Sequence, residues 1–133
     1  MKMIDDLRGQ FFQCEESNET YNSIVGDEKT WRERGCPTEP VTGPRIAFIN
    51  VDSLSEADGV RFLCPKCFSV NKGEIGTHRI HIYFSGKNTP PSVNNGVRWD
   101  VTGTGLHDLT ITPSILLGTG CAWHGFITNG EAT

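Results

Sequence analysis

The chain contains no long hydrophobic run. Nowhere do 18 apolar residues follow one another, which is close to the minimum length of a membrane-spanning helix. The first ten residues carry Asp5, Asp6 and Arg8, where a secretory signal peptide needs an apolar segment. These absences predict a protein that neither enters a membrane nor is exported.

The chain also lacks an excess of basic residues. Its formal net charge is −4. Residues 1–44 hold nine acidic and five basic side chains, whereas residues 45–133 hold seven of each. Proteins that bind nucleic acids normally present a basic face that displaces counterions. The sequence therefore predicts no nucleic-acid partner.

Hydrophobic residues are sparse for a globular protein, at 36% of the chain, and charged residues make up 21%. Fifteen glycines and seven prolines indicate many turns and short elements. A length of 133 residues suits one domain. We predict a single domain over residues 1–133, with an acidic, loop-rich region at 1–44 and a core at 45–133.

Short apolar or alternating segments favour strands over helices. The opening residues 1–14 show near-helical spacing of apolar side chains. Pro113 should force a break or an edge position in the strand that contains it. We expect a mostly β fold with one small antiparallel or mixed sheet, a small α+β fold being the alternative. The predicted strands are 45–51, 60–63, 77–84, 97–102, 109–117 and 126–128.

Two short motifs carry metal-binding residues. Cys64-Pro65-Lys66-Cys67 offers two thiols, and Cys121-Ala122-Trp123-His124 offers a thiol and an imidazole. Four such ligands satisfy a closed, tetrahedral zinc site. We predict that Cys64, Cys67, Cys121 and His124 bind one zinc ion, with His107 or another donor as the alternative to one of the four.

Five cysteines are an odd number, and this favours a reducing compartment over a disulfide framework. Cys14 and Cys36 have no near neighbour, and their roles stay open between free thiols, a disulfide and metal binding. A redox role for Cys64 and Cys67 is disfavoured because residues 68–73 do not predict the helix that usually follows such a pair.

Catalysis by the metal would need an open coordination position and a carboxylate base. The chain has no His-x-Glu or His-Glu-x-x-His motif. We therefore favour a non-enzymatic protein and keep a metal-dependent hydrolase, with Asp108 or His107 beside the zinc, as an alternative. Other acids and histidines able to assist such a hydrolase are Glu74, Asp100, His78 and His81.

His78 and His81 both lie in the predicted strand 77–84. Residues i and i+3 of a strand point to opposite faces. The two imidazoles are therefore poor ligands for one ion.

Several motifs in order resemble an uncharacterised family of small phage and prophage proteins. The motifs are the Cys-Pro-x-Cys knuckle at 64–67, the segment Pro113-Ser114-Ile115, and Cys-x-Trp-His-Gly-Phe at 121–126. The resemblance implies a phage or prophage origin and a zinc-like site on the four residues predicted above, and it implies no reaction.

Together, the motifs and the resemblance lead to one functional prediction. We expect a zinc-stabilised phage accessory protein that binds a host or viral protein in the cytoplasm of a bacterial host. A structural component of the virion is a further alternative.

Overall fold

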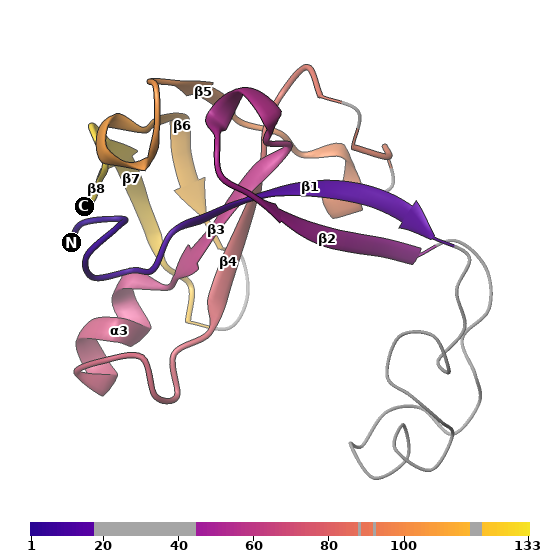
Figure 1. Cartoon of the computed structure of the whole chain (residues 1–133). Coiled ribbons are helices and arrows are strands. Elements are labelled where there is room, and N and C mark those ends of the chain that lie inside the picture. Colours follow the sequence, from indigo (N-terminus) through magenta and orange to yellow (C-terminus); the bar gives the residue numbers. More distant parts are fainter. Residues whose placement is uncertain (18–44, 88, 92, 118–120) are drawn as a thin grey trace, which may run out of the picture. The chain divides into compact units, whose positions relative to one another are not determined.

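The protein was analysed as a computed structural model, which describes residues 1–17, 45–87, 89–91, 93–117 and 121–133 (Figure 1). Most of the described elements are strands. In chain order they are β1 (Gln10–Ser17), β2 (Arg45–Val51), η1 (Leu54–Glu56), β3 (Gly59–Leu63), α3 (Pro65–Asn71), β4 (Arg79–Tyr83), η2 (Val93–Gly96), β5 (Asp100–Thr102), η3 (Leu106–Asp108), β6 (Thr110–Leu116), β7 (His124–Thr128) and β8 (Glu131–Ala132).

The strands form two four-stranded sheets, with the orders β2-β1-β3-β4 and β5-β6-β7-β8. One hydrophobic core contains side chains from both sheets, such as Phe62 and Ile82 from the first and Ile111, Ile115 and Ile127 from the second. The prediction of a mostly β fold is confirmed, with two sheets in place of one. No helix among the described residues is long and apolar enough to cross a membrane.

The chain divides into two compact units, Met1–Cys14 with Ile49–Thr133, and Glu15–Phe48. The first unit carries all the residues discussed below. In that unit the two chain ends lie together, because the Met1 amino group donates to the Ala132 carbonyl at 3.2 Å. Most of the second unit, with Cys36, lies outside the described residues. A single domain over 1–133 therefore stays a prediction.

All six predicted strands are present with small shifts at their ends. The alternation of side chains predicted the location of β4 correctly, because Ile80 and Ile82 are buried whereas Arg79 is exposed. The hairpin between β7 and β8 turns at Asn129 and Gly130, both at positive φ, as an Asn-Gly pair favours.

Two local predictions were wrong. The opening residues form turns and then β1, not a helix, because Arg8 has a φ of 51° and Gln10–Phe12 pair with β3. Their apolar side chains are still buried. In addition, a helix, α3, does follow Cys64: Pro65 begins it, since proline suits the first helical position.

Candidate active site and metal cluster

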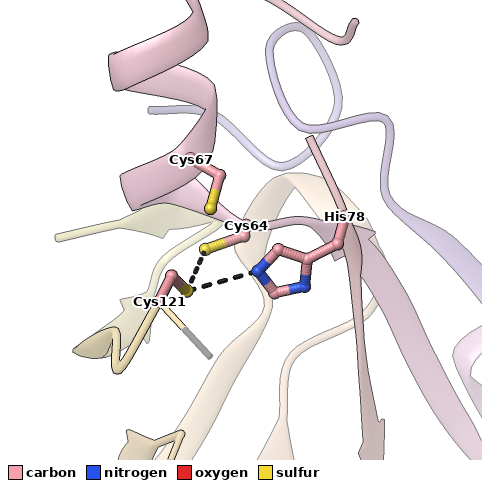
Figure 2. A group of neighbouring side chains, drawn as sticks. All are labelled: Cys64, Cys67, His78 and Cys121. Atoms are coloured by element: carbon pink, nitrogen blue, oxygen red, sulfur yellow. Dashed lines mark hydrogen bonds between the residues drawn. The ribbon is translucent and has the colours of Figure 1, made fainter. Parts of the chain in front are cut away.

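Three of the four predicted metal ligands come together, and the fourth group beside them is His78 (Figure 2). Cys64 directly precedes α3, and Cys67 lies in the first turn of that helix. Cys121 comes from the loop between β6 and β7, and His78 directly precedes β4. One ligand atom from each residue lies within 4.8 Å of the other three. The cluster could hold a metal ion.

The closest approaches within the cluster suit tetrahedral coordination. The Sγ atoms of Cys64 and Cys121 lie 3.3 Å apart, and Nε2 of His78 lies 3.2 Å from Sγ of Cys121. Ligand atoms around a tetrahedral zinc ion stand about 3.5–3.8 Å apart. An ion would therefore need shifts of only a few tenths of an ångström at these two contacts.

The pKa values of the Cys64 and Cys121 thiols are shifted in opposite directions. Burial raises the pKa of the Cys64 thiol to about 11. Burial also opposes ionisation of Cys121, but hydrogen bonds from His78 and Cys64 outweigh it and lower the pKa of that thiol to about 6. A thiolate at Cys121 is the form that binds a metal.

His124 does not join the cluster, although its spacing from Cys121 suggests a ligand. Ala122 has a φ of 53°, and β7 then begins at His124 itself. In an extended strand this side chain lies on the exposed face of the sheet. Conversely, His78 lies outside β4. The alternation of side chains along a strand therefore does not determine where the His78 side chain points.

On the exposed face of the second sheet, His124 meets Ser114. Nε2 of His124 lies 3.0 Å from Oγ of Ser114. This is hydrogen-bonding distance between a histidine base and a serine hydroxyl, the contact that activates serine nucleophiles. Ser114 is partly buried and His124 is exposed. Sequence reasoning missed this pair because Ser114 stands in no recognised nucleophile motif.

A bulge in β6 positions Ser114. Ile111 pairs with Ile127 and Ile115 pairs with Gly125, so three residues of β6 lie opposite one residue of β7. Pro113, within the bulge, has no N–H to give to the ladder. Bulges redirect side chains and occur often beside active sites. The break predicted at Pro113 is therefore present, and it places the hydroxyl beside His124.

Residues 34–133 match the model of the family described as BubE, the bacterial ubiquitination-like system serine protease. The chain belongs to the BubE family. No curated protein and no solved structure gives a match. The match covers both Ser114 and His124 as well as the whole metal cluster.

This membership overturns the functional prediction from sequence. The BubE family is described as a serine protease of a bacterial system, so the prediction of a non-enzymatic phage accessory protein was wrong, and so were its alternatives, a metal-dependent hydrolase and a virion component. The resemblance was correct in finding a family over the C-terminal part of the chain and wrong in describing it as a phage family. The absence of metalloprotease motifs could not exclude an enzyme that uses serine.

Two of the acids suggested as bases, Glu74 and Asp108, make other contacts. Glu74 pairs with Arg8 at 2.9 Å and with Arg79 at 3.6 Å. Asp108 accepts hydrogen bonds from the backbone N–H groups of Thr104 and Gly105, at 2.9 Å each. Among the described residues, no carboxylate lies within ion-pair distance of His124.

Cys14 is a free, partly buried thiol, and its backbone N–H donates to Asp58 at 2.8 Å. Burial raises its pKa. A thiol in this state is a poor nucleophile.

The turn around Asp108 gives a prediction for stability against pH. Hydrogen bonds from the N–H groups of Thr104 and Gly105 lower the pKa of Asp108 to about 2. Because the folded pKa lies below the unfolded one, the carboxylate stabilises the fold above about pH 4, and this contribution is lost as the pH falls toward 2. The difference in unfolding free energy between the wild type and Asp108→Ala should therefore narrow between pH 5 and pH 2. Urea unfolding at several pH values measures it, and a difference that stays constant would contradict the assignment.

Proposed function

We propose that the chain is a serine protease in which Ser114 is the nucleophile and His124 is its general base. The observation that carries the proposal is the 3.0 Å contact between Oγ of Ser114 and Nε2 of His124, in a chain whose family is described as a serine protease. The description of the family indicates the reaction, cleavage of a peptide bond by a serine nucleophile. The contact supports the roles of Ser114 and His124.

In the proposed reaction, Oγ of Ser114 attacks the carbonyl carbon of the scissile peptide bond, and Nε2 of His124 takes the hydroxyl proton. The same proton passes to the leaving amine as the C–N bond breaks, and an ester on Ser114 remains. A water molecule, deprotonated by His124, then hydrolyses the ester and restores the serine. His124 must carry its hydrogen on Nδ1 for Nε2 to accept the proton.

The surroundings of the pair support a dyad that needs little rearrangement. The carbonyl oxygen of Ser114 accepts a hydrogen bond from Nε1 of Trp99 at 3.4 Å, which holds the backbone beside the nucleophile. The ring of His124 lies 6.4 Å from the ring of Phe126, which is the nearest described aromatic contact of the imidazole. These contacts support pre-organisation of the two reacting groups.

The substrate that we propose is a polypeptide of a ubiquitination-like system. The support is the description of the BubE family, which names such a system. The predicted partner protein then becomes the substrate whose peptide or isopeptide bond is cleaved.

We propose zinc as the metal of the cluster, with a structural role. Three cysteines and one histidine form a closed set of sulfur and nitrogen ligands that zinc favours. The cluster draws together the start of α3, the start of β4 and the loop that connects β6 to β7. Because that loop joins the strand of Ser114 to the strand of His124, zinc would hold the two halves of the dyad in register.

Covalent labelling tests the proposed nucleophile. A fluorophosphonate probe should phosphonylate one residue, and peptide mass spectrometry should locate the modification on Ser114. Ser55→Ala, which removes an exposed hydroxyl on η1, should label like the wild type. Labelling of another serine, or no labelling of a folded and metal-loaded protein, would overturn the proposal.

A further inference from the structure

A groove of about 590 Å³ lies between β4 and β6. His81 and Ile82 line it from β4, Leu116 and Leu117 line it from the end of β6, and Val97 and Trp99 complete its apolar lining. Three residues of the metal cluster, Cys67, His78 and Cys121, also line the groove. Trp99, one of the lining residues, also donates a hydrogen bond to the Ser114 carbonyl at 3.4 Å, so the groove and the proposed nucleophile share a neighbour.

The end of β6 lies beyond its pairing with β5. Among the described residues, β5 pairs with β6 from Thr110 to Thr112, whereas β6 continues to Leu116. The N–H of Leu117 donates to the carbonyl oxygen of Trp123, the residue before β7, at 2.9 Å. Because peptide groups alternate in direction along an antiparallel ladder, the N–H and C=O of Leu116 point away from β7. They face the groove.

Ser114 lies two residues before Leu116, at the end of the bulge in β6. Because Ser114 lies in the bulge, the direction of its carbonyl is given by the hydrogen bond that it accepts from Nε1 of Trp99 at 3.4 Å, which directs it toward Trp99. The side chains of Ser114 and Leu116 share the exposed face of the sheet, where Leu116 is 63% exposed. The nucleophile, an apolar side chain and a peptide group that faces the groove therefore occur together.

The opposite wall, β4, also directs peptide groups into the groove. Cys64 donates its N–H to the His78 carbonyl at 2.9 Å, so the peptide groups of residues 78, 80 and 82 face β3, and those of Arg79 and His81 point away from it. The Trp99 N–H donates to the Tyr83 carbonyl at 2.9 Å, which fits the same alternation. Both walls thus carry peptide groups that point away from the strands they pair with, β7 and β3.

The lining combines apolar side chains with two histidines, two cysteines and an asparagine. It contains no lysine, arginine, aspartate or glutamate among the described residues. Burial, followed by the charges of Arg61 and Arg79, lowers the pKa of His81, so this imidazole is neutral at pH 7. A groove of this kind accepts uncharged, apolar side chains and disfavours carboxylates.

We infer that the substrate binds in this groove as an added β-strand, which hydrogen-bonds to the Leu116 peptide group and places apolar side chains against Leu116 and Trp99. The inference rests on the proposed function of Ser114. Strand addition gives affinity through the backbone and selects side chains at alternate positions. The enzyme should therefore cleave extended, apolar segments and not folded or acidic ones.

Peptidyl phosphonates test the inference at the same serine. The probes are acetyl-trileucyl diphenyl phosphonate, its analogue with two aspartates before the last leucine, and two versions N-methylated at one or the other of two adjacent peptide nitrogens. A small alkyl fluorophosphonate, which does not reach the groove, serves as the reference. Rates of labelling at Ser114 are measured by intact mass spectrometry.

In the wild type, the trileucyl probe should react about tenfold faster than its aspartate analogue. N-methylation should slow labelling about tenfold at one of the two nitrogens and have little effect at the other, because only alternate N–H groups of an added strand face the edge. Leu116→Glu should slow the trileucyl probe about tenfold and leave the alkyl fluorophosphonate within about twofold of the wild type. Ile75→Glu, an equal change at a 93% exposed residue outside the groove, should alter neither rate.

Different results would overturn the proposed function and the added-strand inference. If the alkyl fluorophosphonate does not label Ser114, the proposed function falls and the groove inference falls with it. If that probe labels Ser114 but the two N-methylated probes react equally, or Leu116→Glu slows both kinds of probe alike, the added-strand inference alone is overturned.

Discussion

Ser114→Ala should abolish the burst of p-nitrophenol that p-nitrophenyl acetate releases when it acylates the enzyme. Without the hydroxyl no ester can form, and loss of a serine nucleophile typically lowers turnover by about 10⁴-fold or more. The remaining rate should not exceed background hydrolysis. Stopped-flow absorbance measures the burst, and circular dichroism checks that the variant keeps its fold.

His124→Ala should produce a loss of similar size, because serine and histidine act as one unit. Millimolar imidazole in solution should restore part of the activity of His124→Ala and none of that of Ser114→Ala, since only the first variant lacks a base and keeps the nucleophile. Ser55→Ala is the matched control and should retain the full burst. A full burst in His124→Ala would remove His124 from the reaction.

Replacing His78 with alanine should weaken metal binding, whereas His124→Ala should keep one equivalent of zinc. The structure places Nε2 of His78 beside the sulfur of Cys121 and Nε2 of His124 beside Ser114. A structural zinc site contributes roughly 10–16 kcal/mol in small zinc proteins, which equals or exceeds the stability of a typical domain. Chelation, or Cys64→Ser, should therefore unfold much of the protein.

Metal content measured by mass spectrometry and thermal melts followed by circular dichroism check this prediction. Cys14→Ser is the matched control for thiol loss, because Cys14 lies outside the cluster, and it should keep the metal. The opposite result, with metal lost in His124→Ala and retained in His78→Ala, would return His124 to the metal site and remove the dyad.

Much of the fold can be read from local patterns. The alternation of apolar and polar side chains located β4, because a pleated strand with one buried face buries every second residue. Proline without an N–H foretold the irregularity in β6. The opening segment shows the limit of such patterns, because pairing with β3 outweighed a weak helical spacing.

Sequence spacing also determined that the cysteine pair at 64 and 67 meets Cys121, since a Cys-x-x-Cys turn offers two thiols to one ion. For the fourth ligand, spacing selected His124, whereas the group beside the three thiols is His78. A turn with Ala122 at positive φ and the start of β7 decide where His124 points, and these belong to the backbone path and not to the count of residues between ligands.

The sequence by itself thus determined a mostly β chain with a set of cysteines that could hold a metal ion. Only the tertiary structure decided which histidine joins that set and which one meets Ser114. The physical reason is that Ser114 and His124 lie on two antiparallel strands, ten positions apart in the chain, and a bulge in β6 brings their side chains within hydrogen-bonding distance. Pairing and bulge are properties of two strands together, which no single segment of the sequence displays.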